Sequence, residues 1–230
     1  MNLLEAELGS ADLGGQRRFY VGVLGLPVSG GADRLEVQVG LTRLVFRKGE
    51  RPPGPYHLAF DVPEHRFREA TAWLRERAAL LEDAGQDTFF SADWNAHMLY
   101  FRDADGNILE LIARHTLLRP GHAGLLVNVS EVGVAAADVP GTLQTLHHTL
   151  GTEIYRPGIS PGGAHHTPPQ TFAPTGTHSG LLIVVQRGRP WFPTAQAAVP
   201  LPLKIVAQTA RAGEVHLPPG PVQITGLRCP

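Results

Sequence analysis

The sequence has little cysteine, little net charge and no long hydrophobic run. Its 230 residues include one cysteine, Cys229, which excludes an intrachain disulfide and disfavours a catalytic thiol. Lys and Arg number 20 against 21 Asp and Glu, so the formal net charge of -1 gives no general attraction to nucleic acid or to an anionic membrane. These absences favour a small molecule as the partner.

Targeting and membrane signals are also missing. No apolar run approaches the ~18 residues that a membrane-spanning helix needs. Residues 1–7 carry two glutamates and no basic group, unlike the start of a signal peptide. We therefore expect a cytoplasmic protein without a membrane partner, long enough for one large domain or two modest ones.

Hydrophobic patterns predict a strand-helix-strand-strand unit in the first fifty residues. Residues 3–8 are typical of a strand, and Asp12 is a good N-cap for the helix that follows. Two further strands are predicted at residues 35–39 and 41–46. The rest of the chain is organised as repeats of this unit.

The same pattern recurs further along. A second copy has predicted strands at residues 56–62, 98–102 and 108–113, with a helix that begins near Pro63. A weaker third copy begins near Val129. There, Glu131 aligns without a gap with Glu5, and residues 180–185 form a candidate buried strand. Residues 201–207 are a candidate start of a fourth unit.

A glutamate, Glu110, interrupts the apolar strand at residues 108–113. A strand that is apolar on both faces is normally buried on both, and an isolated carboxylate there costs several kcal/mol or loses its charge. A cationic partner is therefore expected. The candidate is His57, the one histidine in the apolar strand at residues 56–62.

Residues 56–60 (YHLAF), a helix, and residues 100–111 (YFRDADGNILEL) together resemble the second half of a vicinal oxygen chelate domain. That superfamily includes glyoxalase I, fosfomycin- and bleomycin-resistance proteins and extradiol dioxygenases. The resemblance implies an α+β fold in which paired βαβββ modules enclose a cleft.

The resemblance also implies a domain organisation. A complete domain is expected at residues 1–115, made of modules 1–52 and 53–115. A linker at 116–127 would follow it. Residues 128–230 would then hold a third, degenerate half-module with a partial fourth, which we expect to be a structural extension without a metal site of its own.

The resemblance implies one divalent metal ion, of which Mn, Fe, Ni and Zn are candidates. His57 and Glu110 stand at two of the family's ligand positions. The third, seven residues before the helix-capping Asp12, holds Glu5 where the family usually has His or Gln. Three alternatives remain open: a bonded core histidine at position 57, a salt bridge from Glu110 to an arginine, and a one-residue shift that would exchange Glu5 for Glu7.

A polar and aromatic segment next to the expected cleft supplies candidates for chemistry. Tyr100 shares a strand face with Arg102, and in the resembling enzymes a tyrosine there contacts substrate. We predict Tyr100 and His97 as catalytic groups. The predicted substrate-binding residues are Trp94, Asn95, Tyr100 and Arg102.

Other histidines, Glu131 and one aromatic segment are weaker candidates for a functional site. Adjacent histidines at 147–148 and 165–166 lack an acid or cysteine at ligand spacing. Glu131 has no His57-like or Glu110-like companion in its own module. Residues 191–194 (WFPT) are open to three interpretations: a lid over the cleft, a partner-facing patch or core packing.

Several functions fit these features. The favoured one is a divalent-metal-dependent enzyme acting on a small molecule with vicinal oxygens by lyase, isomerase or hydrolytic chemistry. An extradiol-type dioxygenase ranks lower, because non-haem Fe(II) oxygenases typically use two histidines and one carboxylate. Two functions without catalysis also fit: a binding protein resembling bleomycin-resistance proteins, and a regulatory protein with a relic site. No nucleic-acid partner is expected, and a homodimer remains open.

Overall fold

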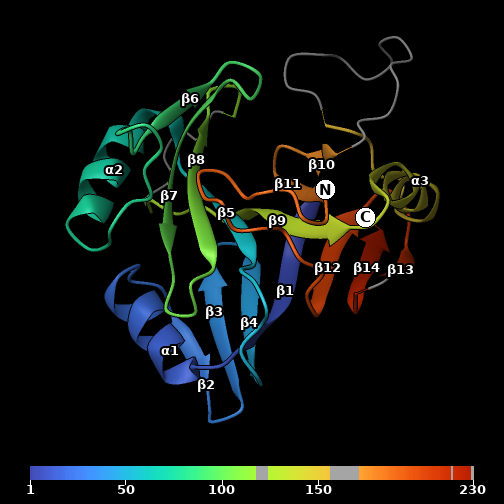
Figure 1. The fold of residues 1–230 in the computed structure, drawn as a ribbon, viewed down its shortest axis with the longest axis horizontal. Coiled ribbons are helices and arrows are strands. Elements are labelled where there is room, and N and C mark those ends of the chain that lie inside the picture. Colours follow the sequence, from blue (N-terminus) through green and yellow to red (C-terminus); the bar gives the residue numbers. More distant parts are fainter. Residues whose placement is uncertain (118–123, 156–170, 219, 229–230) are drawn as a thin grey trace.

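The computed structural model describes residues 1–117, 124–155, 171–218 and 220–228. In these residues the chain forms two seven-stranded sheets and three α-helices (Figure 1). No described helix is long and apolar enough to cross a membrane. The mixed α+β class predicted from the sequence is confirmed.

One sheet, here called sheet A, joins the two ends of the chain. Figure 1 shows its blue N-terminal strands beside its red C-terminal ones. Its strands, in spatial order, are β13 (Gly213–Leu217), β14 (Val222–Arg228), β12 (Leu203–Thr209), β1 (Asn2–Ser10), β4 (Thr42–Lys48), β3 (Arg34–Val39) and β2 (Val28–Gly30).

The other sheet, sheet B, is built from the middle of the chain. Its strands, in spatial order, are β10 (Phe172–Thr177), β11 (Gly180–Gln186), β9 (Val129–Ala136), β5 (His57–Asp61), β8 (Ile108–Arg114), β7 (Ala96–Arg102) and β6 (Phe89–Ser91). Thus the second repeat unit pairs with the third, and the first pairs with the fourth.

This pairing differs from the one expected from the sequence, in which residues 1–115 enclose a single cleft. The first strands of paired units lie side by side and antiparallel, β5 with β9 and β1 with β12. Because each unit offers the same kind of strand edge, the repeat pattern does not determine which two units join. Residues 128–230 therefore complete both sheets instead of forming a separate extension.

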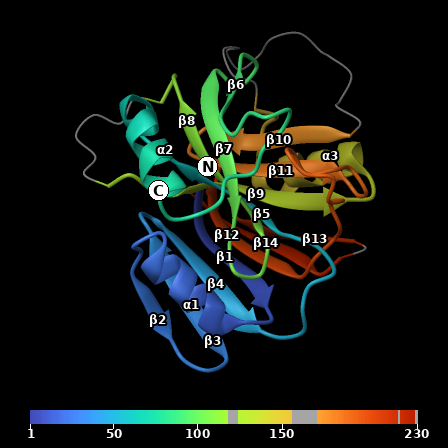
Figure 2. The same cartoon turned by 60° about the vertical axis from the view of Figure 1, so that its left-hand side comes forward.

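Two of the helices start at the same place in their repeat. The side chain of Asp12 accepts a hydrogen bond from Gly15 N at the start of α1 (Leu13–Gly22), as predicted, and Asp138 caps α3 (Val139–Leu150) in the same way. The second unit has a short 3-10 turn, η1 (Glu64–Arg66), and then α2 (Phe67–Arg75). Figure 2 shows α1 and α2 on one side of the molecule and α3 on the other.

Alternation along β5 separates a core face from a cavity face. Leu58 and Phe60 belong to the main hydrophobic core, together with Leu3 and Ala6 of β1 and residues from all three helices. Because successive side chains of a strand point to opposite faces, His57 and Ala59 lie on the other face of sheet B. That face carries the candidate site.

Candidate metal centre

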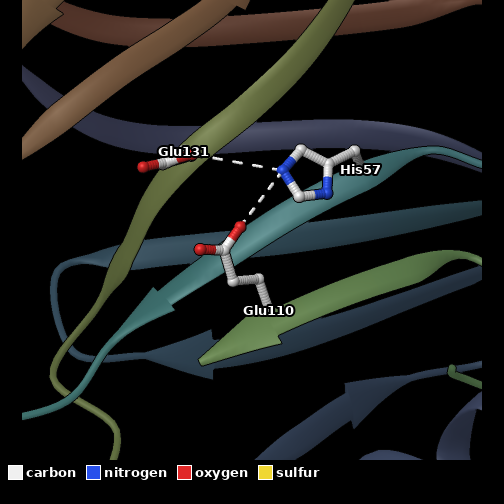
Figure 3. A group of neighbouring side chains, drawn as sticks. All are labelled: His57, Glu110 and Glu131. Carbon is white, nitrogen blue, oxygen red and sulfur yellow. Dashed lines mark ion pairs between the residues drawn. The ribbon is translucent and has the colours of Figure 1, made fainter. Parts of the chain in front are cut away.

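Three ionisable side chains meet on the cavity face of sheet B. They are His57 of β5, Glu110 of β8 and Glu131 of β9, and one ligand atom from each lies within 4.8 Å of the others. His57 Nε2 is 3.5 Å from Glu110 Oε2 and 4.0 Å from Glu131 Oε2 (Figure 3). All three are buried, with at most 5% of each residue exposed.

Strand register brings the two acids together. Ala59 of β5 pairs with Glu110 on one side and with Glu131 on the other. Side chains in register across neighbouring strands share a face, so both carboxylates flank Ala59. His57, two residues earlier in β5, shares that face, and the small side chain of Ala59 leaves the space between the acids open.

The imidazole of His57 is held with Nε2 toward the acids. Its Nδ1 lies 3.3 Å from the backbone oxygen of Ile108, and Trp191 stacks on the ring with the centroids 5.0 Å apart. Burial lowers the pKa of His57 to about 4. A neutral ring whose Nδ1–H donates to Ile108 O presents the Nε2 lone pair, which is the form that binds a metal ion.

The two carboxylates carry more negative charge than their surroundings offset. Arg114, whose side chain is fully buried, donates hydrogen bonds to Glu131 and to Asp61. Burial, then the neighbouring charge of Glu131, raises the pKa of Glu110 well above its usual value. Burial also raises the pKa of Glu131 to about 7, although Arg114 opposes the shift.

A divalent cation fits this arrangement. Arg114 is surrounded by three buried acids, Asp61, Glu110 and Glu131, and its single charge does not offset the charges of Glu110 and Glu131 together. A divalent ion beside His57 would neutralise them. One imidazole nitrogen and carboxylate oxygens are donors that Mn, Fe, Ni and Zn accept. The buried acids and the neutral imidazole therefore satisfy the charge and donor requirements of such an ion.

The internal repeat explains why the site has three such residues and not four. In β8, Glu110 stands two residues after Ile108, the register partner of His57. In β11, Ile183 stands two residues after Leu181, the register partner of Glu131. Ile183 thus holds the position symmetric to Glu110 and lines the same cavity, with an apolar side chain.

The site opens into a cavity of about 320 Å³. Its walls are mainly aromatic, and the aromatic lining residues are Phe89, Phe90, Trp94, Tyr100, Phe172, Trp191 and Phe192. Tyr100 lies directly across the β7–β8 pair from Glu110. Burial and the charges of Glu110 and Glu131 raise the pKa of Tyr100 well above its usual value, so its hydroxyl stays protonated and able to donate.

Glu5 is not part of this group. It lies on sheet A, its side chain is 21% exposed, and its Oε2 accepts a hydrogen bond of 2.8 Å from Arg43 Nε. Glu131 takes the place that the sequence pattern predicts for Glu5, and its companions are the histidine and glutamate of the neighbouring unit. The signal was present in the sequence, since Glu131 interrupts an apolar strand as Glu110 does.

The other predicted site residues divide into two sets. Trp94 and Tyr100 line the cavity, whereas Asn95, His97 and Arg102 do not. His97 Nδ1 lies 2.8 Å from His115 Nε2. Arg102 donates to Gly106 O in the turn before β8, and Asn95 has a positive φ in the turn before β7.

The remaining candidates are also placed. Of the WFPT segment, Trp191 and Phe192 line the cavity, and Trp191 also belongs to a buried hydrophobic cluster, so the lid and the core-packing interpretations both remain. His147 of α3 lies beside Thr152 O and Glu153, and it belongs to no group of three metal-ligating side chains in the described residues. Residues 165–166 and Cys229 lie outside the described residues.

Comparisons with known proteins bear on the fold. No family model and no curated protein matches the chain. Among solved structures, a V278E mutant of glyoxalase I from Zea mays has a TM-score of 0.61 and 13% identity over 98% of this chain and 92% of its own. A proposed dioxygenase from Bacillus subtilis has a TM-score of 0.60 and 13% identity, covering 98% and 85%. Together with the motifs around His57 and Glu110, these likenesses show that the chain has the vicinal oxygen chelate fold.

Proposed function

We propose that this protein is a divalent-metal-dependent enzyme that acts on a small molecule with vicinal oxygens. The observation that carries the proposal is the meeting of His57, Glu110 and Glu131 at the wall of a cavity with many aromatic side chains. Two buried carboxylates without an equal positive charge beside them are costly unless a cation binds. Enzymes among the structural neighbours, glyoxalase I included, support this proposal.

The residues have distinct roles in the proposed reaction. His57, Glu110 and Glu131 would hold the ion, which supplies Lewis-acid stabilisation of negative charge on a substrate oxygen. Tyr100 donates a hydrogen bond to a substrate oxygen, because its hydroxyl stays protonated beside Glu110. The stacked Trp191 and the aromatic walls keep water from the reacting group.

The donor set favours lyase, isomerase or hydrolytic chemistry. One neutral imidazole and two carboxylates cancel the charge of a divalent ion, whereas two histidines and one carboxylate leave it positive, as in non-haem Fe(II) oxygenases. An extradiol-type dioxygenase is the second candidate, and a specific observation favours it. Ile183 replaces a fourth ligand, so coordination positions stay open for two substrate oxygens in a cavity with aromatic walls.

Elemental analysis of the purified protein tests the proposal. After reconstitution with Mn, Fe, Ni and Zn in turn, we expect about one equivalent of metal per chain. His57→Ala and Glu110→Ala should each weaken metal binding by about 100-fold or more, since each removes a ligand, and changing a residue that only hydrogen-bonds to a ligand already costs 10- to 100-fold. Glu5→Ala, the matched change on sheet A, should leave metal binding intact.

Two results would overturn the proposal. One is the absence of metal after every reconstitution, which would favour a non-catalytic binding protein. The other is loss of metal from the Glu5→Ala variant alone. A screen of diol, oxoaldehyde, epoxide and catechol substrates with the loaded protein then separates the reaction classes.

A further inference from the structure

One cationic side chain lines the cavity outside the metal group. Arg189 lies in the segment between β11 and β12, is half-buried, and reaches the same cavity as Glu110 and Glu131. Its guanidinium carbon lies 4.8 Å from the centre of the Phe172 ring. This cation–π contact holds the guanidinium against an aromatic wall of the cavity.

The donors of Arg189 are largely uncommitted. Its Nη1 donates a hydrogen bond of 3.3 Å to the backbone oxygen of the next residue, Pro190. In the part of the chain that the structure describes, no carboxylate lies within 4 Å of its guanidinium nitrogens. An arginine held on a ring without an acidic partner presents a fork of N–H groups that matches a carboxylate.

The charge of the cavity favours an anionic occupant. Glu110 and Glu131 together balance one divalent ion, so Arg189 sets the net charge of the loaded cavity at positive. Among the described residues that line the cavity, Arg189 is the only basic one besides His57, and an imidazole that holds an ion is neutral. A substrate with one negative group therefore completes the charge balance.

The walls favour a planar body for that substrate. Phe172 meets Trp94 edge to face at 6.5 Å, and Phe192 meets Phe89 and Tyr100 edge to face at 4.9 and 5.4 Å. Rings arranged in this way accept a further ring by offset stacking or edge contact. The volume of about 320 Å³ lies within the range of small-molecule sites.

We propose that Arg189 is a specificity residue that binds the carboxylate of a planar aromatic substrate, so that the substrates of this protein are aromatic carboxylates. The assignment of a substrate rests on the proposed function. The contact between Arg189 and the carboxylate does not need the metal, and it can be measured without turnover.

Calorimetric titration of chelator-treated protein at pH 7.5 tests the contact, with 2-naphthoate and its neutral analogue 2-naphthamide as probes. Without the ion, Glu110 and Glu131 repel a carboxylate in the wild type and in Arg189→Gln alike, so the difference between these two proteins isolates Arg189. A charge-assisted hydrogen bond is worth ~1.5–3 kcal/mol, so the ratio of carboxylate affinity to amide affinity should be about 10-fold higher, or more, in the wild type than in Arg189→Gln. Arg189→Gln should keep the affinity for the amide, and Arg189→Lys should give an intermediate ratio.

Arg187→Gln is the matched control, because Arg187 is exposed on the same segment and does not line the cavity. It should preserve the wild-type ratio. An unchanged ratio in Arg189→Gln, a lowered ratio in Arg187→Gln, or the failure of both probes to bind would each overturn the assignment. Metal content of Arg189→Gln is measured alongside. Normal metal binding together with the same ratio in the wild type and in Arg189→Gln refutes this inference alone, whereas a ratio that depends on Arg189 in a protein that binds no metal refutes only the proposed enzyme.

Discussion

Glu5 of sheet A and Glu131 of sheet B occupy the same position of the repeat, seven residues before the aspartate that caps the next helix. Their surroundings differ in two ways. Glu5 is partly exposed and pairs with Arg43, whose own side chain is 47% exposed. Glu131 has a side chain that is 5% exposed and lies beside two further ionisable groups of the neighbouring unit. Position in the repeat therefore does not make a site.

The covering segment makes part of the difference. Two residues after Glu131 comes Gly133, and Trp191 packs against this glycine and stacks on His57. Two residues after Glu5 comes Glu7, whose carboxylate pairs with Arg47 and Lys204 at a surface where both cations are largely exposed. The segment after β11 covers the cavity face of sheet B. This cover buries the ionisable side chains on that face.

The largest expected contrast lies in the arginine partners of the two glutamates. Arg114→Met in chelator-treated protein removes the buried guanidinium that Asp61 and Glu131 both contact, and removing one partner of a buried pair costs ~3–5 kcal/mol. Arg43→Met on sheet A should cost less than ~1 kcal/mol, because exposed pairs contribute little. Urea denaturation of both variants measures the two costs.

Equal costs for these two arginine variants would contradict the contrast between the sheets. A loss of cooperativity in Arg114→Met alone would not contradict it. Such a loss would appear as a shallower slope of the urea transition, which is fitted separately from the midpoint. Arg114→Lys is a useful companion variant. It keeps the charge but loses the branched guanidinium that reaches both acids. Its stability should therefore lie between those of the wild type and Arg114→Met.

A smaller effect is expected from the pH dependence of the buried acid. Burial raises the pKa of Glu110 above its usual value of 4.5, so the folded state favours the protonated form. The stabilising contribution is complete below pH 4.5 and is lost as the pH rises through the folded-state pKa. Glu110→Gln should therefore be more stable than chelator-treated wild type at pH 8, by on the order of 2 kcal/mol, and equal to it near pH 4.5.

Metal should reverse this order. At pH 8 and saturating metal, the wild type should be the more stable protein, because the ion binds the folded state and replaces the missing positive charge. A stability difference that does not change between pH 4.5 and pH 8 would refute the view of Glu110 as an uncompensated buried acid.

Local signals in the sequence predict the elements of the fold and two of the three metal-group residues. Asp12 caps α1, and the apolar strands around His57 and Glu110 lie side by side in register. These predictions succeed because they depend on contacts within one unit. A charged residue in an apolar strand needs a partner nearby, and the second unit supplies both members of the pair.

The third residue depends on which units join. Glu131 reaches the site only because β9 pairs with β5. No local pattern in either unit predicts that the two units join. Position in the repeat makes Glu5 and Glu131 equally good candidates for a metal ligand. The two residues differ in burial. Burial in turn depends on Trp191, which belongs to the segment between β11 and β12, where the repeat pattern makes no prediction.

The smallest expected contrast tests that covering segment directly. A Cβ at Gly133 would lie 2.6 Å from Trp191 and 3.0 Å from the Cβ of His57, so Gly133→Ala must shift the indole away from the imidazole. Overpacking of this kind costs ~1–3 kcal/mol, and we expect the lower end because one face of the indole borders the cavity. The matched change on sheet A, Glu7→Ala, should cost less than ~1 kcal/mol, since it removes only surface pairs. Tryptophan fluorescence should change in Gly133→Ala and stay the same in Glu7→Ala. An unchanged spectrum in Gly133→Ala would mean that Trp191 does not cover sheet B as described.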